Sequence, residues 1–140
     1  MPRRSQVALV DTNVVLRFLL NDDPVQSPKA QRLFIGTIQG RAVLEVGDGV
    51  VAECVWVLEK ALHVPRLEIA RHLVRLLSLP GVQGQGSTRS ILDALVTYGR
   101  TRCDIVDCLL DARARSRKAR VYTFDATDFK KLRCSWAEPG

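Results

Sequence analysis

The chain has 140 residues, of which 46% are hydrophobic and 26% charged, with a formal net charge of +6. These values are typical of one globular domain, so we expect a single domain over residues 1–140. The first apolar run, Val7–Val10, is too short for a signal peptide or a membrane span, which predicts a cytoplasmic protein without membrane contact. The basic excess favours a polyanionic partner such as a nucleic acid.

The cysteines form no C-x-x-C pair, and His63 and His72 do not combine with them in the spacing of zinc ligands. We therefore expect reduced thiols in the core at Cys54, Cys103, Cys108 and Cys134.

Apolar runs that predict strands alternate with stretches of helical apolar spacing. In chain order the predicted elements are a strand at 7–10, helices at 12–20 and 28–39, a strand at 42–44, a helix that carries Glu53, a helix at 67–79, a short strand from Val82, helices at 88–98 and 104–118, a strand at 121–124, a turn of helix at 128–132 and a strand at 133–136. This alternation predicts an α/β fold, with a parallel sheet covered by helices on both faces.

Two of the predicted strands run directly into an aspartate, Asp11 and Asp125. Ligands of open parallel sheets bind beyond the carboxyl ends of the strands, so both carboxylates are candidates for a binding site. The alternative is that each only caps the helix that comes after it.

Glu53 lies within the apolar stretch Gly49–Leu58. An unpaired buried carboxylate is costly, so this residue needs a partner or a site. The alternatives to a functional role are a position at the helix edge, from which the carboxylate extends into solvent, or an ion pair with Arg17, Arg41 or Arg100.

Asp104 and Asp107 are three residues apart and project from one side of a helix. Asp at a helix start is also favoured by the helix dipole, which alone would account for Asp104. Asp111 continues the same side, and we expect it to be a solvated charge.

Carboxylates that converge in this way need compensating positive charge. Oxygen ligands without nearby His or Cys select Mg²⁺ or Mn²⁺, ions that support phosphoryl transfer. Thr12, Asn13 and Thr123 could orient a carboxylate or a water molecule, or only cap the backbone. The candidate ligands are Asp11, Glu53, Asp104, Asp107 and Asp125.

A basic run closes the helix that Asp104 begins. It is either a solvated face that complements the helix dipole or a contact for the phosphates of a nucleic acid. Its members are Arg113, Arg115, Arg117, Lys118 and Arg120.

These residues resemble the PIN-domain nucleases, and within them the VapC-type toxins of bacterial toxin-antitoxin pairs. Val10–Leu19 is similar to the opening motif of the family, with Asp11 as its first acid. Val51–Leu58 is similar to the segment that carries the glutamate, here Glu53.

Two further motifs extend the resemblance over nearly the whole chain. Asp104–Asp107 is similar to the third motif, in which the second aspartate is the firmer metal ligand. Thr123–Asp125 resembles the fourth, with Asp128 as a helper. One departure is the Ile105-Val106 pair, where the family commonly has an aromatic and a small residue.

The resemblance implies a three-layer α/β/α sandwich around a parallel sheet of about five strands. It also implies Mg²⁺- or Mn²⁺-dependent cleavage of RNA, a homodimer and a small antitoxin protein that masks the site. In this interpretation the catalytic residues are Asp11, Glu53, Asp107 and Asp125, with Asp104 in support.

Three alternatives stay open at the level of sequence. A non-catalytic RNA-binding or regulatory module on the same scaffold would need only the basic charge. A phospho-acceptor receiver domain would need a lysine near a late strand end, where this chain has Asp125. A haloacid-dehalogenase-like phosphatase would need an aspartate at the position of Asn13.

Overall fold

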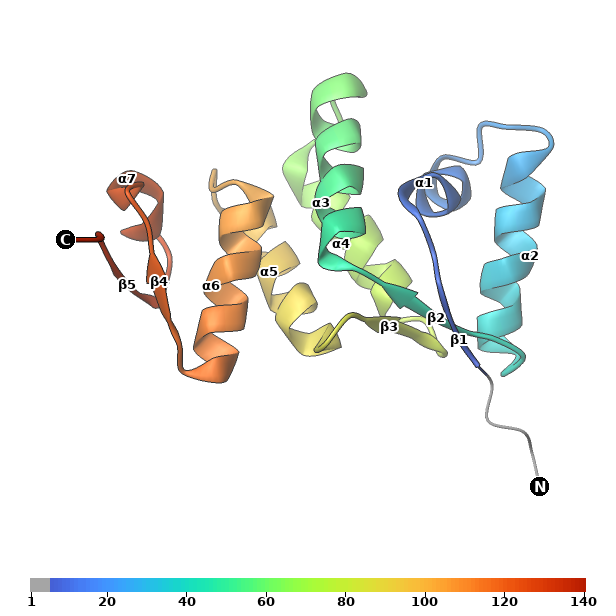
Figure 1. Cartoon of the computed structure of the whole chain (residues 1–140). Coiled ribbons are helices and arrows are strands. Elements are labelled where there is room, and N and C mark those ends of the chain that lie inside the picture. Colours follow the sequence, from blue (N-terminus) through green and yellow to red (C-terminus); the bar gives the residue numbers. More distant parts are fainter. Residues whose placement is uncertain (1–5) are drawn as a thin grey trace.

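The computed structural model describes residues 6–140, so residues 1–5 of the expected domain lie outside the described part (Figure 1). The strands are β1 (Val7–Leu9), β2 (Val43–Val46), β3 (Val82–Gly84), β4 (Arg120–Tyr122) and β5 (Ser135–Ala137). The helices are α1 (Thr12–Leu20), α2 (Gln26–Ile38), α3 (Asp48–Trp56), the π-helical turn η1 (Val57–Ala61), α4 (Arg66–Leu77), α5 (Thr88–Arg100), α6 (Ile105–Arg117) and α7 (Ala126–Phe129). The alternation of strands and helices confirms the α/β class. None of the described helices has the length and apolar character needed to cross a membrane.

The five described strands pair in parallel, as expected, but they are divided between two sheets. One sheet has the order β1-β2-β3, and the other contains only β4 and β5. Figure 1 shows β4 and β5 at one end of the molecule, with α5 and α6 between them and β1. The sequence did not predict this division, which leaves both β1 and β4 with a free edge.

The element boundaries differ from the predicted ones by at most two or three residues. The start of α2 illustrates why a boundary differs from its prediction. The helix begins at Gln26 and not at Pro28. The Asp23 carboxylate accepts hydrogen bonds from the backbone N–H groups of Val25 and Gln26, at 2.9 and 2.6 Å. These bonds satisfy donors that an earlier helix start exposes.

The helix that carries Glu53 continues into η1 without a break. The π geometry is shown by the bond from Leu62 N–H to the Val57 carbonyl, at 3.1 Å. The wider turn ends at His63, which has a positive φ of 53°. Single π turns of this kind often lie near functional sites, and this one carries Glu59.

The core is one contiguous cluster in which α5 packs between α4 and α6. Ile91 and Leu95 of α5 are fully buried. The four cysteines are free and buried, which confirms the expectation of core thiols.

The expectation for Asp111 is wrong, because its side chain is only 1% exposed. The Asp111 carboxylate accepts hydrogen bonds from the N–H groups of Arg133 and Cys134, at 3.0 and 2.8 Å. It also pairs with Arg115 at 3.1 Å. The segment that returns after α7 covers this face of α6, so Asp111 holds that segment in place.

Candidate metal centre

Three aspartates from the C-terminal third of the chain form the tightest acidic cluster among the described residues. Asp107 lies in the first turn of α6, Asp125 precedes α7, and Asp128 lies within α7. Each offers a carboxylate oxygen, and these oxygens lie within 4.8 Å of one another. Asp107 and Asp128 are half-buried and Asp125 is exposed. An all-oxygen donor set of this size suits Mg²⁺ or Mn²⁺, which fits the ion that the sequence predicted.

Local capping explains why two of the predicted acids point where they do. Asp104 is the N-cap of α6, and its carboxylate accepts a bond from Val106 N–H at 2.8 Å. Asp125 is the N-cap of α7 and accepts a bond from Asp128 N–H at 3.1 Å. The capping alternative therefore holds for Asp125, and Asp104, expected to be favoured by the helix dipole, is a helix cap as well. Capping does not exclude a metal, because each carboxylate has further lone pairs.

The cluster is electrostatically strained without a cation. Burial, followed by the negative charges of the neighbouring aspartates, raises the pKa of the Asp107 carboxyl from 3.8 to about 6. A bound divalent ion would remove this repulsion, so the cluster is better suited to hold a cation than to stand alone.

A second acidic pair lies where the junction of β1 and α1 contacts α3. Asp11 caps α1 by accepting a bond from Val14 N–H at 3.1 Å. Glu53 lies on α3 and accepts a hydrogen bond from the Thr12 hydroxyl at 2.9 Å. Both carboxylates lie close enough to Cys54 to affect its thiol. Burial, followed by the negative charges of Glu53 and Asp11, raises the pKa of the Cys54 thiol to about 12.

The expected environment of Glu53 is wrong in one respect. Its helical neighbour Trp56 is 62% exposed, so this face of α3 is open to solvent and not buried. Among the described residues Glu53 has no ion pair, and Arg17 instead contacts Asp22 at 3.0 Å. Thr12 is the partner of Glu53, and its role is to orient the carboxylate.

The structure does not bring all five predicted ligands into one cluster. The group within 4.8 Å contains Asp107 and Asp125 but neither Asp11 nor Glu53. A groove of about 460 Å³ nevertheless connects the two acidic regions, since Glu53, Asp104 and Asp128 all line it. Asp11 lines a different cavity of about 440 Å³, together with Asn13.

The other predicted supporting residues have clear places. The Thr123 hydroxyl accepts a bond from Asp125 N–H at 2.9 Å, which fixes the turn that carries Asp125. Asp128, expected only as a helper, belongs to the acidic cluster itself. Its position depends on α7 folding back toward α6, which no local pattern encodes.

The basic run lies at the end of α6 that is opposite the acidic cluster. The 13 residues of this helix span about 20 Å at 1.5 Å per residue. Arg113 pairs with Asp48 at 2.7 Å, and Arg115 pairs with the buried Asp111. The remaining members, Arg117, Lys118 and Arg120, are exposed.

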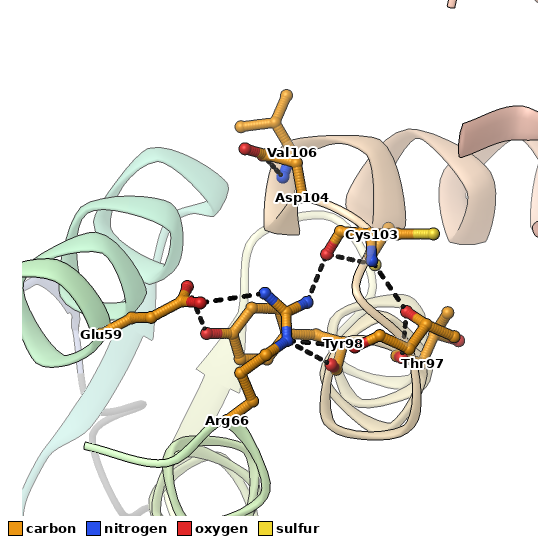
Figure 2. Close-up of polar contacts among 9 residues, drawn as sticks. Glu59, Arg66, Thr97, Tyr98, Cys103, Asp104 and Val106 are labelled. Carbon is orange, nitrogen blue, oxygen red and sulfur yellow. Dashed lines mark hydrogen bonds and ion pairs between the residues drawn. The ribbon is translucent and has the colours of Figure 1, made fainter. Parts of the chain in front are cut away.

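Sequence reasoning missed a polar network beside the groove, which Figure 2 shows. The Arg66 guanidinium pairs with Glu59 at 3.1 Å and lies 3.8 Å from the centre of the Tyr98 ring. It also donates to the carbonyls of Thr101, at 3.0 Å, and Cys103. Arg66 thereby fixes the loop that immediately precedes Asp104. A lone arginine after Pro65 offers no sequence signal for this role.

The family model of the PIN domain matches residues 8–133. The chain therefore belongs to the PIN domain family. PIN domains are in general metal-dependent nucleases, and the acidic cluster is a donor set that can bind a divalent metal. The comparison with curated proteins gives no significant match.

Proposed function

We propose that this protein is a metal-dependent endoribonuclease that hydrolyses RNA phosphodiester bonds at a Mg²⁺ or Mn²⁺ site. The observation that supports it most directly is the cluster of Asp107, Asp125 and Asp128, whose oxygens lie within 4.8 Å of one another in a PIN domain. Asp107 is the central ligand in this proposal, because its raised pKa reports the strongest need for a compensating cation.

The chain's own residues supply binding and orientation. Asp107, Asp125 and Asp128 would hold the ion, with Asp104, Glu53 and Asp11 as the remaining acids of the site. When bound, such an ion lowers the pKa of a water molecule and stabilises negative charge on the phosphodiester. Thr12 fixes the Glu53 carboxylate and Thr123 fixes the turn of Asp125, so neither acid has to be ordered at the moment of reaction.

The surface charge supports an RNA substrate. With a net charge of +6 and the acids concentrated at the site, the rest of the surface is more basic than the total indicates. Lys60 and Arg102 line the same groove as Glu53 and Asp104, so cations flank the acidic region directly. We assign the contact with phosphates near the site to these residues. The basic run, chiefly Arg117, Lys118 and Arg120, would contact RNA farther away.

Within this proposal the protein is the toxin of a type II toxin-antitoxin pair, acts in the cytoplasm and is masked by a small antitoxin protein. The order of the four acidic motifs over the chain supports this assignment. The free, buried cysteines fit a reducing compartment.

The test is incubation of purified protein with total bacterial RNA and Mg²⁺ or Mn²⁺. We expect discrete fragments that disappear with EDTA and with the Asp107→Asn variant. The Asp93→Asn variant is a control that removes a carboxylate from α5, outside the acidic region. Cleavage that persists in purified Asp107→Asn would contradict the assignment.

One observation favours a second candidate, a non-catalytic RNA-binding module on the PIN scaffold. Asp11 and Glu53 do not join the Asp107 cluster within the chain, so the metal site is incomplete in this arrangement. Titration with Mn²⁺ separates the two functions. A folded protein that binds RNA but no Mn²⁺ would be the binding module.

A further inference from the structure

Trp56 presents an aromatic ring in the groove that Glu53 and Asp104 line. Its side chain is 62% exposed, and it ends α3 three residues after Glu53. Residues three apart are neighbours on a helix surface, so Glu53 and Trp56 share one face of α3. Single exposed apolar residues are ordinary on protein surfaces. The informative feature is therefore the position of this ring within the groove, and not its exposure alone.

Two cations flank the ring. Lys60 and Arg102 line the same groove as Trp56, and both are exposed. In the described part of the chain neither of them forms an ion pair. The other cation of the groove, Arg66, is already neutralised by Glu59 at 3.1 Å. Lys60 and Arg102 are therefore the groove cations that remain for a ligand.

The segment that carries Arg102 is held in place from both sides. The Arg66 guanidinium donates to the carbonyls of Thr101, at 3.0 Å, and of Cys103, the two residues that flank Arg102 (Figure 2). It also pairs with Glu59 of η1, the turn that carries the other cation. This network fixes the two walls of the groove relative to each other. A ligand that binds between fixed walls loses less affinity to the ordering of the protein.

The lining of the groove favours a nucleic acid over a protein as the ligand of Trp56. Most of the residues that line it are charged. The buried centre of a protein interface is instead depleted of charged side chains. An aromatic ring beside cations is the combination that binds single-stranded nucleic acid. Asp128 of the candidate metal centre lines the same groove, so a base on Trp56 would lie close to the site of the proposed cleavage.

The ring can stack only on a base that is not enclosed in a duplex. In a double helix each base lies between its stacked neighbours, and its faces are closed to a side chain. The groove volume of about 460 Å³ is within the range of small-ligand sites and suits one nucleotide. Purines overlap an indole ring more fully than pyrimidines do, because they have two fused rings.

We propose that Trp56 stacks on one unpaired base of the RNA, preferably a purine, while Lys60 and Arg102 contact the neighbouring phosphates. Trp56 is then a specificity-determining residue, because it selects which base enters the groove beside the metal centre. It touches no reacting atom. Its role in cleavage specificity rests on the proposed nuclease function, whereas the stacking requires only that the protein binds RNA.

The test compares two ligands of equal charge, an adenosine RNA octamer and an abasic ribose-phosphate octamer, in EDTA so that no metal-dependent cleavage occurs. The anisotropy of a terminal dye gives the dissociation constants Kd. The wild-type protein should bind the adenosine octamer about tenfold more tightly, because only this ligand can stack. Trp56→Ala should bind the two octamers equally weakly. Trp56→Phe keeps a smaller ring and should retain part of the preference.

Two sets of control variants separate stacking from charge. Ile35→Ala removes an apolar side chain of α2 that is 47% exposed and lies outside the groove, so it should leave both affinities unchanged. Lys60→Gln and Arg102→Gln should weaken the binding of both octamers by the same factor. Each should also reduce the slope of log Kd against log salt concentration by about 0.7.

Tryptophan fluorescence gives a second measurement at Trp56 itself. The chain has two tryptophans, and Trp136 of β5 is partly buried against the core. Trp136→Phe therefore leaves Trp56 as the only tryptophan. The adenosine octamer should quench its fluorescence by stacking, whereas the abasic octamer should not.

The stacking proposal is overturned if the wild-type protein binds the two octamers equally or binds neither. It is overturned as well if Trp56→Ala keeps the preference, or if Ile35→Ala loses it. A Trp56→Ala protein with unchanged RNA binding but a different molecular mass in light scattering would show that the ring contacts a protein instead.

The nuclease function fails in a different way. If it is wrong, no RNA is cleaved with Mn²⁺, yet the adenosine preference and the quenching remain. If the stacking is wrong, the wild-type protein cleaves total bacterial RNA, and Trp56→Ala does so with the same KM. If both are right, Trp56→Ala should raise KM about tenfold with little change in kcat, as expected when a residue contributes only to binding.

Discussion

Replacement of Asp107 by asparagine should make the metal-free protein more stable at neutral pH. In the folded chain, burial and then the neighbouring aspartates raise the pKa of this carboxyl from 3.8 to about 6. Above that pH the native state carries a charge that its surroundings disfavour. Asparagine has nearly the same shape and no charge, so it removes the penalty.

The size of the effect is set by linkage between protonation and folding. A native pKa of about 6 against 3.8 in the unfolded chain corresponds to about 3 kcal/mol without solvent screening. Asp107 is only half-buried, so we reduce this to roughly 1 kcal/mol. In a domain of this size that free energy raises Tm by about 3 to 4 °C.

The sign fixes the pH window. Between pH 3.8 and about 6 the native carboxyl holds its proton while the unfolded one has lost it, so the wild-type protein loses stability as the pH rises through this range. The advantage of Asp107→Asn should therefore be small near pH 4 and complete above pH 6. Added Mg²⁺ or Mn²⁺ should reverse it, because only the wild-type site gains the cation.

The assay is thermal unfolding in EDTA across pH 4 to 7.5, repeated with divalent metal. Glu138→Gln is the control, since it removes one carboxylate from an exposed position after β5. The reasoning would be refuted if Asp107→Asn were less stable than the wild type at pH 7 without metal. It would also be refuted if Glu138→Gln gave the same pH-dependent gain.

Three further predictions concern the residues that hold the site in place. Asp111→Ala should lower the free energy of unfolding in urea by about 3 kcal/mol, because it leaves two backbone N–H groups and Arg115 without their acceptor. Asp111→Asn keeps one acceptor oxygen and should lower this free energy by less. Equal losses in the two variants would contradict this role of Asp111. Tyr98→Phe should lower the free energy of unfolding by about 1 kcal/mol at pH 7. Burial alone raises the pKa of Glu59, but hydrogen bonds from Tyr98 and Arg66 hold this pKa below the usual 4.5. Their stabilisation is therefore present above pH 4.5 and is lost as the pH falls through the folded pKa. In an acid titration the difference in stability between Tyr98→Phe and the wild type should become smaller, and a constant difference would argue against the ionic contribution. Burial first, and nearby charges second, raise the pKa of the Cys54 and Cys108 thiols to about 12. A thiol reagent at pH 8 should therefore label these two cysteines only in urea. Fast labelling of either one in the native protein would show that its thiol is accessible.

Local signals explain what could be predicted from the sequence. Helix periodicity, prolines and glycines lie within a few residues of the boundaries they set, so most elements were predicted to within two or three residues. Asp11, Asp104 and Asp125 each cap the helix that comes after them, which their positions at element junctions had indicated. The spacing of the acidic motifs is likewise a property of the chain, and it was enough to indicate the PIN family, which the family match confirms.

Only the tertiary structure decided how these acids are grouped. Asp128 joins the cluster because α7 folds back toward α6, and Asp111 is buried because a segment 22 and 23 residues later covers it. Arg66 reaches carbonyl groups 35 and 37 residues away. The division of the strands into two sheets places Asp11, which follows β1, apart from Asp125, which follows β4. The physical reason is common to all of them: local propensity and capping act over one or two turns, whereas burial, ion pairing and strand order depend on which distant surfaces meet.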